Sequence, residues 1–333
     1  MIDLNVRLDS SLTDDEYGLL ARSQGIDVKE TFPECRSFNF KNASLEDYLN
    51  VRQFALSLLQ NEEAIEFAVK SLVHRLFHAG YFYFEIALTP FLHKEGGLSQ
   101  RKIVKAALVG LNDALMKCPG IDGNLVLYCH RDASEDYNTE TCRLALEYRD
   151  ERIVAVGLEG DDKNHPIGEY EKLFARCKKV NYPVVIELGK HYNSNNSILK
   201  AAQIGAKRIV SPYKVDLSIQ TFQIIKEKGV YFEFTPSLDI VKGFLKDYES
   251  FEIKKFWQRG YDFFVSGSSY TILNASLKDE FIHLGQHSAF TRDDVYHSLY
   301  ISIQAAFTRN LRERNRILKG VIDSFNDFYN KTI

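Results

Sequence analysis

The sequence lacks the features that mark a membrane protein or a nucleic-acid-binding protein. In 333 residues no apolar stretch approaches the roughly 20 residues that a membrane span needs. The amino terminus runs directly into Ile2–Val6, without a basic segment or the apolar core of a signal peptide. The net charge of -3 gives no electrostatic attraction to nucleic acid or to an anionic membrane. We therefore expect a soluble cytoplasmic protein with neither kind of partner.

Cysteine is scarce, and linker-like segments are absent. The five cysteines stand apart with no CxxC pair, and their odd number argues against a disulfide framework. We interpret them as reduced, buried thiols. No Pro/Gly/Ser-rich linker, low-complexity tract or short repeat divides the chain. With 45% hydrophobic residues the chain can bury one large core, and we predict a single domain over residues 1–333.

The chain does contain a regular alternation of apolar runs and helical segments. The run Val184–Leu188 is continuously apolar up to its glutamate, which is typical of a strand buried on both faces. Eight such strands with helical connections favour an α/β fold, the (β/α)8 barrel, over an open sheet. Extra helices are expected after the first strand, at 45–60 and 62–78, and from Thr291 to about residue 330. The predicted strands cover residues 2–8, 81–88, 124–129, 153–158, 183–188, 208–210, 230–234 and 262–265.

Polar residues follow almost every predicted strand at its carboxyl end. In a parallel barrel these ends form the face where ligands and catalytic groups lie. The charges of Glu187 and Lys190, at the end of the fifth strand, therefore face a site or close one. The predicted pocket comprises Asn5, Arg7, Asp9, Gly160, Asp161, Glu187, Lys190, Ser211, Ser268 and Ser269.

Several short motifs at these strand ends occur in a characteristic order. They include Leu158–Asp162, Glu187–Lys190 and Ser266–Ser269. This order resembles the adenosine/adenine deaminase family of the amidohydrolase superfamily, over nearly the whole chain. The segments Leu92–Leu98 and Gly205–Ile209 are similar to those of its bacterial members. The resemblance implies a zinc-bearing (β/α)8 barrel that removes ammonia from a purine by attack of a metal-bound hydroxide.

The residues at the metal-binding positions differ from those of the family. Asn5 and Arg7 stand where the family has a zinc-binding His-x-His pair, and Glu187 stands where it has a third histidine. Ser268 and Ser269 stand where the family has two aspartates that bind zinc and orient the hydroxide. Amides, hydroxyls and a permanently charged arginine are poor zinc ligands. We therefore predict a site without zinc and without any other cofactor.

The proton-transfer positions have changed as well. Lys190 stands where the family uses a glutamate to protonate the purine ring, and Ser211 stands where a histidine helps to activate the water. Without a metal, water keeps a pKa of about 15.7 rather than about 7. We therefore predict a pseudoenzyme without zinc-dependent deamination, with no catalytic residue assigned beyond the candidate Lys190.

The lost zinc ligands suggest a coordinated replacement by charged side chains. Arg7 and Lys190 bring positive charge to the place where the family holds a dication, and Glu187 brings negative charge. Opposite charges about 4 Å apart gain roughly 4 kcal/mol at an effective dielectric constant of about 20, before desolvation is subtracted. Our hypothesis is that an Arg7–Glu187 pair, with Lys190 nearby, fills the emptied metal site. The alternative is that these side chains point elsewhere.

Some positions that hold the substrate in the family are retained. Asp9 matches an aspartate on the ribose side of the substrate, and Gly160 matches a glycine whose backbone meets the purine. A helix cap at Asp9 and a simple turn at Gly160 are equally consistent with the sequence. The Ser266–Ser269 loop is suited to a phosphate beside Arg7 and Lys190, or is a generic turn. The ligand classes left open are a purine nucleoside and another polar or anionic small molecule.

Three functions remain open at this point. The first is a catalytically degenerate deaminase-like protein that binds a ligand, a protein partner or a second copy of itself, as a sensor or subunit. The second is a metal-independent enzyme in which Lys190 forms a Schiff base or transfers a proton. The third is a purely structural role beside an active deaminase. A residual purine nucleoside deaminase, a hydrolase, is a further alternative.

Overall fold

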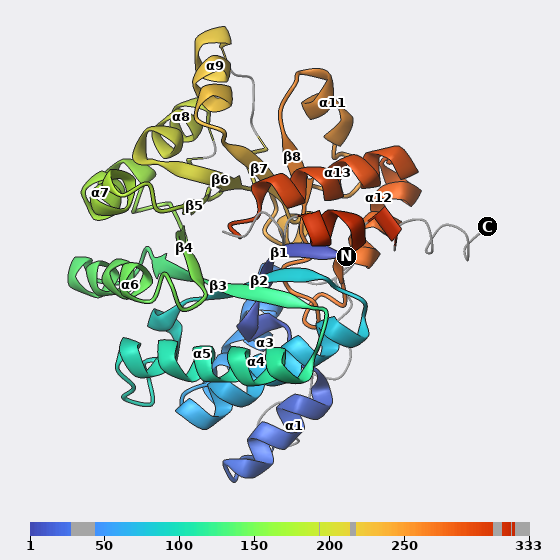
Figure 1. Cartoon of the computed structure of the whole chain (residues 1–333). Coiled ribbons are helices and arrows are strands. Elements are labelled where there is room, and N and C mark those ends of the chain that lie inside the picture. Colours follow the sequence, from blue (N-terminus) through green and yellow to red (C-terminus); the bar gives the residue numbers. More distant parts are fainter. Residues whose placement is uncertain (28–43, 193, 214–217, 309–314, 321, 324–333) are drawn as a thin grey trace.

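Eight parallel strands form one sheet whose spatial order follows the chain, from β1 to β8. The computed structural model describes every residue except 28–43, 193, 214–217, 309–314, 321 and 324–333. The sheet curls into a barrel with the helices outside it (Figure 1). The strands are β1 Ile2–Arg7, β2 Tyr83–Leu88, β3 Asp122–His130, β4 Ile153–Glu159, β5 Val184–Glu187, β6 Ala206–Val210, β7 Tyr231–Phe234 and β8 Phe263–Val265. The predicted strands and the (β/α)8 class are confirmed.

The first and last strands meet just beyond the end of β8. Val6 forms an isolated parallel bridge with Ser268, and the Arg7 amide donates a hydrogen bond of 3.0 Å to the Ser268 carbonyl. The register of β1 against β2 shifts between Asp3 and Val6. The bridge brings the polar residues that follow β8 beside those that end β1. Both groups lie at the end of the barrel where the strands have their carboxyl ends, which we call the mouth.

Helices surround the barrel, and most begin at a side-chain cap. Ser44, for example, accepts the amide hydrogen of Asp47, whose carboxylate accepts that of Ser44, so α3 starts with a reciprocal capping box. The two helices predicted after the first strand are confirmed as α3 and α4. The α-helices are α1 Asp14–Ser23, α3 Leu45–Leu58, α4 Glu62–His78, α5 Gln100–Lys117, α6 Glu135–Glu147, α7 Glu171–Lys179, α8 Asn195–Ile204, α9 Ile219–Glu227, α10 Pro236–Val241, α11 Ile253–Gln258, α12 Leu277–His287 and α13 Arg292–Ala305.

The predicted helical segment from Thr291 to about residue 330 is interrupted after Ala305 and is helical again at residues 315–320. The predicted start at Thr291 is correct, because its side chain caps α13, which lies against β8 and β1 (Figure 1). The helix ends at Ala305, since Ala306 adopts extended backbone with ψ 138°. The Phe307 amide then donates a 2.8 Å hydrogen bond to the Glu85 carboxylate. This turn directs the chain to the barrel interior, and much of the remaining predicted helix lies outside the described residues.

The barrel interior contains both an apolar layer and a buried ion pair. Arg208 of β6 and Glu85 of β2 are 1% and 0% exposed and form a salt bridge. The Phe307 ring lies 4.1 Å from the Arg208 guanidinium, and the Leu4 carbonyl accepts a 3.0 Å hydrogen bond from it. The apolar layer consists of Ala87, Val126, Tyr128, Val154, Ala155, Val185 and Val210.

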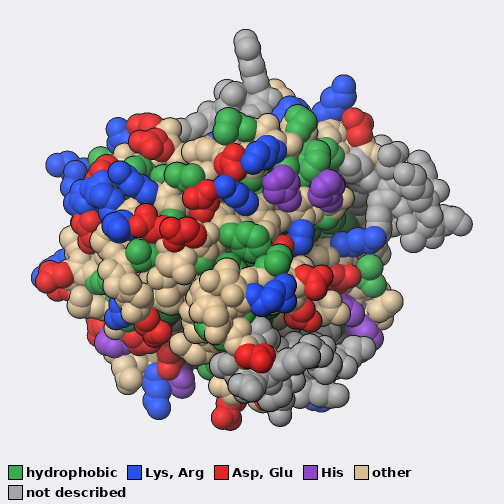
Figure 2. Space-filling model, turned by 90° about the horizontal axis from the view of Figure 1, so that it is seen from below, with side chains coloured by type: hydrophobic (Ala, Val, Ile, Leu, Met, Phe, Trp, Pro, Cys, Tyr) green, Lys and Arg blue, Asp and Glu red, His purple; other side chains and the backbone are tan. Residues whose placement is uncertain are grey.

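The described helices and surface side chains are mixed in polarity and charge. None of the helices in the described part of the chain is long and apolar enough to cross a bilayer. On the face seen in Figure 2, acidic and basic side chains are interspersed, and among the described residues neither sign forms a continuous patch. The distribution agrees with the small net charge of -3.

The cysteines within the described residues are free and buried, as predicted. Their spacing in the sequence does not indicate that two of them lie close together. The sulfur atoms of Cys129 in β3 and Cys142 in α6 are 3.7 Å apart. Cys177 of α7 also lies against Cys142. Cys35 falls outside the described residues.

Packing inside β4 makes a first prediction about stability. A Cβ at Gly157 would lie 2.4 Å from the Tyr128 ring, whereas a Cβ at Gly168 would meet nothing within 4 Å. We expect Gly157→Ala to lower the free energy of unfolding by about 1–3 kcal/mol through overpacking. Gly168→Ala, the matched control, should change it by less than about 1 kcal/mol. Urea unfolding of both variants measures the difference, and equal midpoints would refute this account of the packing.

Candidate functional site

The Arg7 side chain lies at the centre of the barrel mouth, between two carboxylates. One guanidinium nitrogen donates to Glu159, and the other donates to Glu187 at 2.5 Å. All three residues are at most 6% exposed. The predicted Arg7–Glu187 pair is therefore confirmed, and Glu159 is a second partner. Burial opposes the charge of Arg7, but the two carboxylates raise its pKa well above the ordinary value.

A second cation reaches Glu187 from a helix. Lys242, which follows α10, pairs with the other carboxylate oxygen of Glu187. Lys190, expected in this place, is exposed, and its amino group lies beside Gly243. The difference has a local cause, because the buried Asp162 carboxylate accepts the amide hydrogens of residues 191 and 192 and so directs this loop outward. Schiff-base chemistry at Lys190 remains a prediction.

A third cation comes from α3, one of the helices inserted after the first strand. The Arg52 guanidinium lies 2.7 Å from Asp9 and 3.6 Å from Glu159. The Thr89 hydroxyl donates a further hydrogen bond to Glu159. Three cations, Arg7, Arg52 and Lys242, thus face three carboxylates, Asp9, Glu159 and Glu187. We call these six residues the mouth cluster, whose formal charges cancel.

The mouth cluster keeps its glutamates ionised. Burial alone would raise their pKa values, but Arg7 and Arg52 hold the pKa of Glu159 well below its ordinary value. Burial is likewise outweighed at Glu187, where Lys242 and Arg7 lower the pKa. A carboxylate with a lowered pKa is a weak base, so neither glutamate is suited to remove a proton from water.

The remaining positions predicted for the metal and the hydroxide are buried. The Ser211 hydroxyl donates to Asp239 at 2.6 Å, and the Ser269 hydroxyl lies 3.1 Å from that of Tyr48. Asn5 and Ser268 are at most 1% exposed. Ser211 and Ser269 are thus engaged by neighbouring side chains, whereas the Asn5 Oδ1 and Ser268 Oγ atoms have no hydrogen-bond partner among the described residues.

The predicted substrate-contacting residues are engaged within the protein. The carboxylate oxygens of Asp9 accept from Ser10 at 2.9 Å and from Arg52. Gly160 adopts φ +107°, a conformation that favours glycine, and its carbonyl accepts a 3.0 Å hydrogen bond from Arg131. The neighbouring Asp161 side chain is 64% exposed and lies at the rim.

The described residues do not fit a zinc ion. They contain no group of three or more histidine, cysteine, aspartate and glutamate side chains placed to hold a metal. The nearest candidates, Glu159 and Glu187, are bridged by the Arg7 guanidinium and carry further partners. A cation bound there would have to displace arginine, so the expected replacement of metal by ion pairs agrees with the geometry.

Comparison with known proteins identifies the family. A family model described as adenosine deaminase matches residues 2–324. The chain belongs to the adenosine deaminase family. An adenosine deaminase of Clostridium perfringens is 28% identical over 327 residues, which cover 95% of this chain and 96% of the relative. The predicted family resemblance is therefore confirmed.

Solved structures confirm the (β/α)8 barrel fold. An adenine deaminase from Arthrobacter aurescens has a TM-score of 0.84 and 18% identity, with 98% of each chain covered. An amidohydrolase from Burkhoderia ambifaria with bound zinc has a TM-score of 0.86 and 14% identity, covering 99% of this chain and 91% of that one. At these identities the similarity concerns the fold.

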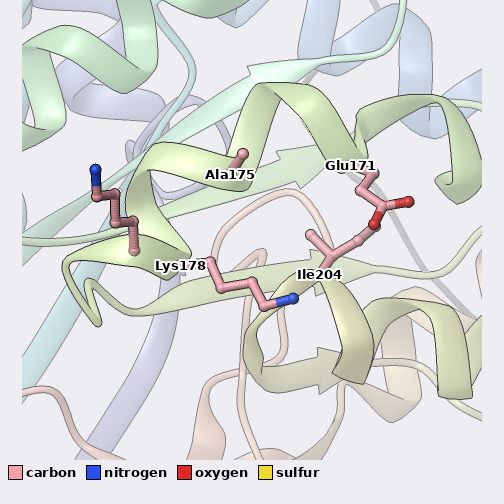
Figure 3. A pocket seen from close by; sticks show the side chains of 5 residues that line it. Glu171, Ala175, Lys178 and Ile204 are labelled. Atoms are coloured by element: carbon pink, nitrogen blue, oxygen red, sulfur yellow. The ribbon is translucent and has the colours of Figure 1, made fainter.

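One surface depression lies away from the mouth. A depression of about 370 Å³ between α7 and α8 is lined by Ala175, Lys178, Ile204 and two neighbours (Figure 3). Lys178 and Ile204 precede β5 and β6, so this part of the depression lies toward the amino ends of the strands, opposite the mouth. No converging polar groups mark it as a site for a specific ligand.

Buried carboxylates on the β7 side of the barrel make a prediction about pH. Burial raises the pKa of Glu280 to about 8, although Tyr248 and Ser237 donate hydrogen bonds to it. Between about pH 4.5 and 8 the folded state therefore holds a proton that the unfolded state has lost. Stability should fall as pH rises through this window, by up to roughly 1.4 kcal/mol per pH unit.

The variant Glu280→Gln should flatten this pH dependence, because its amide stays neutral. Burial also raises the pKa of Asp239 to about 6 and that of Glu233 to about 7, so a shallower slope should remain. Glu227→Gln, on the exposed face of α9, is the control. Urea midpoints measured from pH 5 to 8 decide the matter, and identical slopes in both variants would contradict the assignment to Glu280.

The mouth cluster predicts a large loss of stability when Arg7 is neutralised. Arg7→Met leaves Glu159 and Glu187 buried with fewer partners, which should cost about 3–5 kcal/mol. Lys102→Met removes a surface pair with Glu62 and should cost at most about 1 kcal/mol. If urea unfolding gives similar losses for the two variants, the cluster does not stabilise the mouth as described.

Proposed function

We propose that this family member does not deaminate purines through zinc and acts as a binding protein. The observation that carries the proposal is the Arg7 guanidinium bridging Glu159 and Glu187. Arg52 and Lys242 complete the compensation of charge in the mouth cluster. A cluster that is neutral as a whole has no uncompensated negative charge that would attract a metal dication.

The chemistry of the remaining groups supports the same proposal. Hydrolytic deamination needs a hydroxide near neutral pH, which zinc supplies elsewhere by lowering the pKa of bound water to about 7. The carboxylates at the mouth are weak bases, because their cations lower their pKa values. Ser211, in the position of a proton-transfer histidine, donates to Asp239 instead. These groups are arranged for mutual pairing rather than for activating water.

Binding of a polar small molecule is the role we assign to the mouth. Solved structures of the same fold include Arabidopsis proteins in complex with IMP and with GMP. Lys190 lies at the rim with an exposed amino group, and no ion pair engages it within the described part of the chain. We therefore propose a purine nucleoside or nucleotide as the ligand class, bound without turnover by a cytoplasmic protein that serves as a sensor or as a subunit of a larger assembly.

Metal content and deaminase activity provide the decisive test. We expect no stoichiometric zinc by mass spectrometry after purification in zinc-containing buffer, and no ammonia release from adenosine, adenine or AMP. The Clostridium perfringens adenosine deaminase, prepared in parallel, is the positive control. One zinc per chain together with turnover would overturn the proposal.

The binding role has a separate readout. Thermal unfolding with adenosine, IMP or GMP should give a saturable rise in melting temperature, because a ligand that binds only the folded state stabilises it. Lys190→Ala should weaken the effect of the nucleotides more than that of adenosine, since it removes a rim cation. If none of the three shifts the melting temperature, the purine ligand class is wrong while the loss of catalysis stands.

A further inference from the structure

The barrel interior below the mouth cluster contains more buried acid than buried base. Asp3, Glu85 and Glu233 are at most 1% exposed, and Arg208 is the buried cation that faces them among the described residues. Arg208 is committed to Glu85 and stands 3.9 Å from Glu233. Glu85 and Glu233 thus share one arginine, and Asp3 adds a third carboxylate near Glu233 without an ion pair among the described residues, in contrast to the balanced mouth cluster. A buried charge without compensation is costly, so this imbalance needs a further partner.

Unpartnered oxygen atoms gather at the same place. Both carboxylate oxygens of Glu233 are buried and lack a well-formed hydrogen bond, as do Asn5 Oδ1 and the Ser266 and Ser268 hydroxyl oxygens. Asn5 and Ser266 lie against the Glu233 carboxylate. Most buried polar atoms have a hydrogen-bond partner. Five buried oxygen atoms without one, on three neighbouring strand ends, therefore indicate that a partner is missing from this place.

The neighbouring Asp3 carboxylate, in contrast, receives its hydrogen bonds from groups of the protein itself. Asp3 accepts hydrogen bonds from the Gly267 backbone amide at 2.9 Å, the Tyr270 hydroxyl at 2.7 Å and the Asn5 backbone amide at 3.1 Å. Glu233 has no comparable set of donors among the described residues. The Asn5 and Ser266 side chains beside it can donate as well as accept, but each carries an oxygen atom without a partner, and such oxygen atoms suit a cation rather than a second anion.

We propose that Glu233, Asn5, Ser266 and Ser268 bind a monovalent alkali cation, Na⁺ or K⁺, inside the barrel. Carboxylate, amide and hydroxyl oxygens are ligands of hard cations, whereas zinc prefers nitrogen, sulfur and several anionic ligands. One unpaired carboxylate matches a single positive charge. The ion neutralises part of the acidic excess and gives the five oxygens a common partner. The site is structural, and it stands or falls independently of the proposed binding role of the mouth.

Thermal unfolding of the full chain in different chloride salts tests the site. At pH 8.5 and constant ionic strength, NaCl or KCl should raise the melting temperature by at least about 3 °C over N-methyl-D-glucamine chloride, and the rise should saturate. Glu233→Gln keeps the shape and removes the charge, so it should abolish the rise. The control Glu227→Gln, on the exposed face of α9, should retain the rise in full.

A direct structural readout covers the case in which Glu233→Gln does not fold. Crystals of the unaltered chain soaked in thallium(I) acetate should give an anomalous peak within coordination distance of the Glu233 carboxylate. Ser266→Ala provides a milder variant and should weaken the salt-dependent rise. Equal melting temperatures in all three salts, an undiminished rise in Glu233→Gln, or the absence of a thallium peak at Glu233 would each overturn the proposal.

Discussion

The arrangement of the barrel mouth depends on one constraint, namely that the buried glutamates at the ends of β4 and β5 need cations. Glu159 and Glu187 both bind Arg7, but one arginine cannot compensate two carboxylates. The additional positive charges come from Arg52 on α3 and Lys242 beyond α10. Two helices from distant parts of the sequence are therefore held at the mouth by electrostatics as well as by packing. The cost of an unpaired buried charge makes these contacts interdependent.

The same dependence bears on how the site differs from those of zinc enzymes. Replacing Arg7 alone by a metal ligand would leave Lys242 and Arg52 beside a newly bound dication. Replacing the cations alone would leave bare carboxylates. A single substitution therefore does not convert one kind of site into the other without leaving unbalanced buried charges. Membership of the family fixes the barrel, whereas the chemistry depends on the side chains at its mouth.

The strands and their polar ends could be predicted from the sequence, because a strand buried on both faces leaves a continuous apolar run and a parallel barrel gathers its carboxyl ends. The Arg7–Glu187 pair was predicted from the resemblance to the deaminase family, which places both residues at positions of zinc ligands. Arg52 and Lys242 could not be found in this way, since Arg52 lies on α3 and Lys242 directly after α10, where a basic residue usually indicates a solvated face. The pattern also does not show that Asp162 binds the amides after Lys190, nor that Lys242 rather than Lys190 pairs with Glu187. The contact of Cys129 with Cys142 likewise depends on how α6 packs on β3, which spacing alone does not reveal.

The turn after α13 has a consequence for the order of events during synthesis. The Phe307 amide and ring complete the surroundings of Glu85 and Arg208, which belong to the second and sixth strands. Phe307 follows all eight strands in the sequence, so it leaves the ribosome after them. We therefore expect the Glu85–Arg208 pair to remain incompletely enclosed on the nascent chain until Phe307 docks. The barrel then reaches its final interior only when the segment after α13 is in place, which makes that segment a determinant of productive folding in the cell.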